Sequence, residues 1–228
     1  MQRIRLALLL VALLAGCAGV PQKPLSGASA AVLKNQTLIA SFADKPDFAA
    51  WTPGKIVLAG GLFGGMWAVS AGNGIVEENH VPDPAAQIAY KLTLAMAARY
   101  GADAKPRLLR VNSDAVEDIA DTARASTRYI VDVRTLHWGL SAFPGSWWRY
   151  RVQYAARARL IDTWQRLVLA EGRCDFTRLD DRSAPTYDEL VDRQAAGLKW
   201  ELGTATALCV NVLQQQMRLA LNGSRELA

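Results

Sequence analysis

The fold is decided by thirteen residues, Trp148-Arg149-Tyr150-Arg151-Val152-Gln153-Tyr154-Ala155-Ala156-Arg157-Ala158-Arg159-Leu160. The even positions of this stretch are all apolar or aromatic, whereas the odd positions include four arginines and a glutamine. Because successive side chains of a β-strand point to opposite faces of the sheet, a period of two predicts a half-buried strand with one solvated face. Such alternation is typical of an antiparallel sheet.

The flanking segments predict that this strand is the centre of a three-strand meander, 129–174. The preceding segment, Tyr129–Leu140, also alternates, and a turn at Phe143–Ser146 joins the two. A second turn at Asp162–Gln165 leads into a third strand over Arg166–Cys174. Gly, Pro, Ser and Asp at these joints are the residues that turns favour.

Short strands and a helix are predicted before the meander. The runs Thr37–Phe42 and Arg107–Val111 have the composition of strands. Between them, Asp83 is a suitable N-cap and Pro84 a suitable first helical residue, and Gly101 ends the same helix.

Two further helices are predicted from their capping residues. Ser113 or Asp114 is expected to cap a helix that runs through Ala125. Thr186-Tyr187-Asp188-Glu189 is a capping box, and it opens a helical stretch to about Leu221 with an expected break near Gly203.

These elements predict an α/β (α+β) fold with a single, mainly antiparallel sheet of about four to five strands, packed by helices that include a long C-terminal helix. Their order over residues 36–221 resembles that of the periplasmic α/β domains of the curli-secretion lipoprotein and the penicillin-binding-protein activator lipoproteins, and of the N-terminal domain of the Tol system. The resemblance implies a fold but no function, because one fold hosts many functions.

The N-terminal residues predict export and lipidation. Arg3 and Arg5 precede the uncharged, leucine-rich run Leu6–Leu14, which is the layout of a secretory signal. The run Leu14-Ala15-Gly16-Cys17 resembles the lipobox of bacterial lipoproteins. The resemblance implies cleavage before Cys17 and attachment of lipid, palmitate included, to that cysteine. An ordinary signal peptide that ends in a chance cysteine is the alternative.

This resemblance divides the chain into a signal peptide (1–16), a lipidated tether (17–35) and a single periplasmic α/β domain (36–228). The apolar run of the signal is too short to span a membrane, so that anchoring depends on the lipids of Cys17. Ala18 stands where an aspartate would resemble an inner-membrane retention signal. The expected location is therefore the outer membrane, facing the periplasm.

Composition and charge exclude some functions. The signal holds two of the 26 basic residues and none of the 21 acidic ones, so that the mature chain has 24 basic residues against 21 acidic ones and a net charge of +3. No long run of lysine or arginine is present. A nucleic-acid partner is therefore not expected, and it would also be out of place for an exported protein.

With Cys17 lipidated, Cys174 and Cys209 are left as a pair. A disulfide between them is expected in an oxidising periplasm, where it would stabilise the fold by about 3–4 kcal/mol. Two buried free thiols are the alternative.

The most unusual stretch is residues 56–76, which contain no charged residue. Gly60, Gly61, Gly64 and Gly65 form overlapping G-x-x-x-G patterns, which let two helices approach closely. Three interpretations are open: a glycine-rich helix and loop packed on the domain, a contact with an oligomer or partner that uses these glycines and Trp67, or insertion into a membrane.

Sequence motifs for catalysis are lacking. The chain has no G-x-S-x-G elbow, no P-loop and no dinucleotide fingerprint, and only two histidines. Glu77, His80 and Asp83 could hold a metal, but their spacing matches no known ligand set. His137 is interpreted as a packed or edge residue. No enzyme activity, metal or cofactor is expected, although paired carboxylates for hydrolysis can come from anywhere in a chain.

Two surfaces are candidates for binding. The face with Arg149, Arg151, Arg157 and Arg159 can bind an anionic lipid or glycan, or it can be a solvated face paired with acids such as Asp132 and Glu171. The aromatic residues Trp138, Trp147 and Trp148 can form an exposed patch or belong to the core.

Three functional hypotheses follow. The first is a non-catalytic outer-membrane lipoprotein that binds a protein partner, or self-associates, within an envelope assembly or export system. The second is a periplasmic lipoprotein that binds lipid or glycan. The third is a hydrolase.

Overall fold

A computed structural model describes residues 22–52 and 62–219, with the side chains of 62–67 excepted. Within these ranges the helices are α2 (Gly27–Ala31), α4 (Leu62–Glu78), α5 (Pro84–Tyr100), α6 (Val116–Ala123) and α7 (Tyr187–Gln216). The strands are β1 (Thr37–Phe42), β2 (Ala49–Trp51), β3 (Asp103–Arg110), β4 (Tyr129–Phe143), β5 (Ser146–Asp162) and β6 (Leu167–Thr177).

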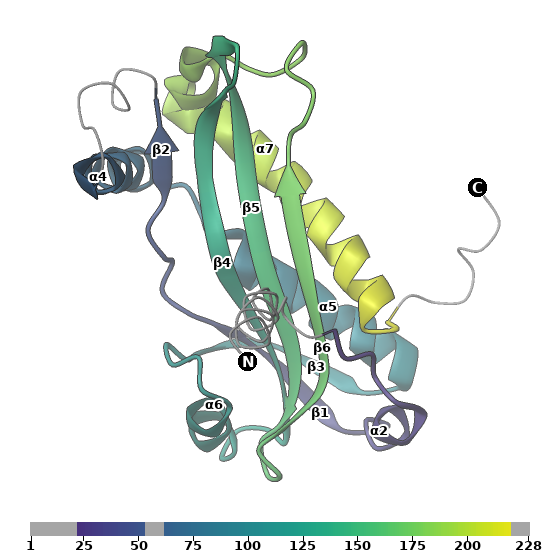
Figure 1. Cartoon of the computed structure of the whole chain (residues 1–228). Helices are drawn as coiled ribbons and strands as arrows, with labels where there is room; N and C mark the ends of the chain where they lie inside the picture. Colours follow the sequence, from purple (N-terminus) through teal and green to yellow (C-terminus); the bar gives the residue numbers. More distant parts are fainter. Residues whose placement is uncertain (1–21, 53–61, 220–228) are drawn as a thin grey trace, which may run out of the picture.

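One mixed sheet organises the described part of the chain, with the strand order β3-β1-β4-β5-β6 (Figure 1). The meander β4-β5-β6 is antiparallel, as predicted, and its two ladders are the longest in the sheet. Strand β1 lies between β3 and β4 and is parallel to both. The short β2 pairs in parallel with Gly139–Ser141, near the C-terminal end of β4. The predicted α/β class with a mainly antiparallel sheet is confirmed.

Helices cover both faces of the sheet, but unequally. Helices α5 and α7 lie behind the strands in Figure 1 and enclose the main core. Helix α6 covers the lower part of the other face, where Ile119 and Ala123 pack on Ile130 and Ile161 in a second, smaller core. The face that carries the arginines is therefore not solvated along its whole length.

Helix α5 begins and ends at the predicted residues. The carboxylate of Asp83 accepts a hydrogen bond from the backbone N–H of Ala85, and Gly101 adopts the left-handed conformation at the C-cap. The predicted cap of α6 is wrong, because Ala115 is the N-cap and makes no side-chain hydrogen bond there. The Ser113 hydroxyl instead accepts from the N–H of Ala115 and donates to Asp118.

Helix α7 begins at the predicted capping box, in which Thr186 and Glu189 exchange hydrogen bonds. The break predicted near Gly203 is wrong, since that residue lies inside regular helix. The helix is interrupted earlier, because Arg193, Gln194 and Ala195 have positive φ angles of 51°, 59° and 54°. After this interruption, the helical turn that contains Gly197 packs closely against the first turn of the helix. A Cβ at Gly197 would lie 2.2 Å from the carbonyl oxygen of Glu189.

The predicted tether is packed along much of its length. Lys23 forms an antiparallel bridge with Glu171 on the outer edge of β6. Leu25 and Leu33 are buried in the main core, on either side of the short helix α2. This part of the tether belongs to the folded unit, because burial of the two leucines removes apolar surface from water.

The disulfide between Cys174 and Cys209 is present and joins β6 to α7. Both cysteines are buried in the main core. The bond therefore fixes the C-terminal helix to the last strand of the meander.

Candidate functional site

The four arginines of β5 lie in two separate pairs. Arg157 and Arg159 stand near α6, where Arg159 is only 4% exposed. Both pair with Asp114, and Arg157 also lies 3.7 Å from Glu171. Their charges are thus largely used inside the protein.

Asp132 is the centre of this buried ionic cluster. Its side chain is fully buried and accepts hydrogen bonds from Arg134 at 2.9 Å, Arg159 at 2.7 Å and the Ser41 hydroxyl at 2.7 Å. A buried carboxylate needs such partners, because an unpaired charge in the interior is costly. The cluster fastens β1, β4 and β5 together rather than presenting a charged surface.

The carboxyl of Asp114 forms the exposed end of the same cluster. Burial raises its pKa, but the hydrogen bond from Arg157 and the positive charges of Arg159, Arg157 and Arg134 outweigh that effect, and the pKa lies below its usual value. Asp114 is therefore ionised at neutral pH and neutralises the arginines beside it.

The second pair, Arg149 and Arg151, lies toward the other end of β5. Arg149 donates to the carbonyl oxygen of Ala184 at 2.7 Å and lies 3.8 Å from Glu189. Arg151 donates to the Ser141 hydroxyl at 3.1 Å. Since each pair has its own protein partners, the four residues do not form one continuous cationic face.

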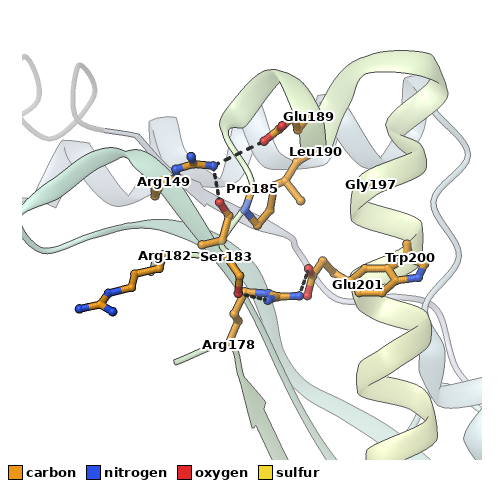
Figure 2. A pocket seen from close by; sticks show the side chains of 11 residues that line it. Arg149, Arg178, Arg182, Ser183, Pro185, Glu189, Leu190, Gly197, Trp200 and Glu201 are labelled. Carbon is orange, nitrogen blue, oxygen red and sulfur yellow. Dashed lines mark hydrogen bonds and ion pairs between the residues drawn. The ribbon is translucent and has the colours of Figure 1, made fainter. Parts of the chain in front are cut away.

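A pocket of about 480 Å³, which the sequence does not predict, opens between β5, the loop after β6 and the start of α7. In its wall Arg178 donates to Glu201 at 2.6 Å and to Ser183 at 3.2 Å, and its guanidinium lies over Trp200, 5.9 Å from the ring centre. Figure 2 shows these residues pointing toward one another, while Arg182 points away. The wall is thus held together by its own ion pair.

The three tryptophans of the predicted aromatic patch are divided between core and surface. Trp138 is fully buried, with its indole N–H donating to the carbonyl oxygen of Pro46 at 2.9 Å. Trp147 and Trp148, by contrast, are 54% and 64% exposed at the start of β5, beside the turn that joins β4 to β5. We call these two adjacent residues the hairpin tip; that turn is at the top of Figure 1.

The glycine-rich segment is partly described. Gly60 and Gly61 lie outside the described residues; Gly64, Gly65 and Trp67 belong to α4, where side chains are described only from Ala68 onward. Among the described residues, no helix has the length and apolar character needed to cross a membrane.

The α4 helix is attached to the domain through its later residues. A Cβ at Gly72 would lie 1.9 Å from the carbonyl oxygen of Phe48, so that only glycine allows this approach. Next to it, the Asn73 side chain accepts from the N–H of Phe48 and donates to Asp47, both at 2.8 Å. These contacts explain the glycine and the polar residue in an otherwise apolar segment.

The acidic and histidine residues before α5 do not gather around one point. In the described ranges no group of three or more His, Cys, Asp or Glu side chains is placed to hold a metal ion. Glu77 and His80 are exposed, whereas Asp83 caps α5 and accepts from the Thr135 hydroxyl. Burial raises the pKa of Asp83, although the N–H of Ala85 and the Thr135 hydroxyl act against it.

No protein-family model matches the chain. No curated protein matches it significantly either.

Several solved structures resemble the fold. The PelC dodecamer from Paraburkholderia phytofirmans is 14% identical, with a TM-score of 0.38 over 87% of this chain and 94% of that one. The lipoprotein GNA1162 from Neisseria meningitidis is 10% identical, with a TM-score of 0.28 over 75% and 95%. The C-terminal domain of LpoB from Escherichia coli is 11% identical, with a TM-score of 0.21 over 74% and 93%. Similarity at this level carries no argument about function.

Proposed function

We propose that the chain is a non-catalytic lipoprotein of the bacterial outer membrane, anchored through Cys17 on the periplasmic side, whose hairpin tip contacts a protein. The protein contacted is an envelope partner or a second copy of the chain. The observation that carries this proposal is the exposure of Trp147 and Trp148, which are consecutive in β5 and therefore stand on the two faces of the longest hairpin at its end.

Exposed tryptophans at such a position favour a binding surface. Tryptophan is enriched among the residues that contribute most to protein–protein binding, because it buries a large area with few rotatable bonds. The surrounding backbone is held in place. The N–H of Tyr150 donates to the carbonyl oxygen of Pro185 at 2.8 Å, and the backbone of Arg149 forms an isolated antiparallel β-bridge with Thr186. The tip is thus presented on a fixed support, which limits the entropy lost on binding.

The polar residues support a non-catalytic role. Asp83 caps a helix and Asp132 neutralises two arginines, so that both are used in the structure.

The lipid anchor is tested separately from the contact. The full chain, expressed in a Gram-negative host, is expected to incorporate labelled palmitate and to sediment with outer membranes. The Cys17→Ser variant should lose both properties. Absence of the lipid from the N-terminal peptide by mass spectrometry would refute the anchor.

The contact is tested by placing a photo-crosslinking amino acid at position 148 in the membrane-bound protein. We expect one discrete adduct, whose mass identifies either a partner or a second copy. A Trp147→Ser change in the same chain should remove the adduct, because it takes away half of the tip. The matched control is the same crosslinker at position 164, which is similarly exposed but lies at the other end of β5. Equal adducts at both positions, or none at 148, would refute the proposed contact.

A further inference from the structure

The place where the chain leaves the fold toward Cys17 limits how the molecule can stand on a membrane. The backbone of Lys23 exchanges two hydrogen bonds of 2.8 Å with Glu171, which fixes it to the outer edge of β6. Six residue steps separate Lys23 from Cys17. Even when fully extended, they span at most about 20 Å.

The two ends of the sheet lie at different distances from this point. Glu171 pairs with Arg159 on β5, so that Lys23 stands at the level of Arg159. From there Trp147 is twelve residues away along β5, or about 40 Å at the rise of an antiparallel strand. The opposite end of β5, at Asp162, is three residues away, or about 10 Å.

A tether of about 20 Å is longer than the distance of about 10 Å from the attachment point to the β5–β6 turn, whereas the hairpin tip, about 40 Å away, meets the bilayer only when the sheet lies along the membrane. The turn between β5 and β6, at the bottom of Figure 1, lies well within reach.

The β5–β6 turn carries side chains suited to a membrane surface. Trp164 is 62% exposed and Leu167 is 53% exposed. The guanidinium of Arg128 lies over the Trp164 ring, 4.8 Å from its centre, and pairs with Asp162 at 3.0 Å. Tryptophan with a cationic neighbour is the combination found at the level of lipid headgroups, where the ring meets acyl chains and the cation meets phosphate.

We propose that the β5–β6 turn rests on the phospholipid surface that carries the lipid of Cys17, with Trp164 and Leu167 inserted at headgroup level. This inference rests on the proposed lipid anchor. With the sheet upright on this turn, the hairpin tip faces away from the membrane, where a periplasmic protein can reach it. The occupant of the turn is the bilayer and not a protein, because the tether holds this end of the molecule beside the lipid.

Tryptophan quenching by brominated lipid tests the contact. The lipidated full chain is placed in vesicles of phosphatidylethanolamine and phosphatidylglycerol, with and without bromine near the headgroup end of the acyl chains. Bromine quenches only those tryptophans that touch the lipid. We expect quenching in the native protein and loss of most of it in Trp164→Phe. The matched control, Trp148→Phe, should keep it.

Each outcome decides the inference. Quenching that persists in Trp164→Phe, or that disappears in Trp148→Phe, overturns it. Loss of quenching only in Trp67→Phe also overturns it and places α4 in the lipid instead. If Trp164 is shielded from water but not quenched by brominated lipid, a protein contacts this end of the molecule, and the inference is overturned as well. A chain without lipid on Cys17 fails earlier, in the mass of its N-terminal peptide, so that failure of the anchor is distinguished from failure of the membrane contact.

Discussion

Reduction of the disulfide between Cys174 and Cys209 should destabilise the protein by an amount that the structure allows us to calculate. The two cysteines are 35 residues apart in the chain. Closing a loop of that length removes conformational entropy from the unfolded chain that is worth about 4 kcal/mol at room temperature. For a domain of this size, each kcal/mol corresponds to about 2–4 °C in Tm, so that reduction should lower Tm by about 8–16 °C.

The assay is urea unfolding of the mature chain in detergent, followed by circular dichroism with and without a reductant. Both sulfurs are buried, so that the reductant must be present while the chain is unfolded. The control is the Cys174→Ala/Cys209→Ala variant, whose unfolding free energy should not respond to the reductant. A difference below about 1 kcal/mol between oxidised and reduced native protein would refute the loop-entropy reasoning.

Two further predictions concern α4 and α5. Gly72→Ala should lower the free energy of unfolding by about 1–3 kcal/mol in the same urea assay, because its Cβ would overlap the carbonyl oxygen of Phe48; Gly74→Ala, with space around it, is the control and should not destabilise. Asp83→Asn keeps a good N-cap but cannot ionise. Because the folded-state pKa of Asp83 is raised above its unfolded value, its contribution to stability is present below the unfolded pKa and is lost as pH rises through the folded pKa. Relative to the native chain, Asp83→Asn should therefore gain Tm between about pH 4 and pH 7, and an equal difference in Tm at both pH values would contradict this account.

The sequence predicts the meander well and its surroundings less well. Alternation over 148–160 is enough to place β5, because the period of two follows from the backbone alone. It cannot show what covers each face, and it therefore assigns Arg159 to a solvated face, which is wrong. The apolar Ile161, two residues further on the same face, is the one local sign of the second core beneath α6.

The remaining differences arise from tertiary contacts. The three residues of β2 are too few for any pattern, and they pair with β4 because α4 packs on the segment before them. The interruption of α7 contains no glycine or proline, since Arg193, Gln194 and Ala195 adopt left-handed conformations. Intrinsic preferences disfavour such residues there, and only the folded environment holds them in place. Of the candidate site, the sequence identifies both tip tryptophans but does not separate them from the buried Trp138.

The outer edges of the sheet determine how copies of this chain can meet. Strand β3 forms one edge, and its pairing with β1 shifts around Pro106, which has no N–H to offer another strand. Strand β6 forms the other edge, and the bridge from Lys23 already occupies it at Glu171. At Pro106 and at Glu171 these two edges are thereby poor templates for adding a strand from a neighbour. At these positions, association of copies through side chains is favoured over addition of a strand.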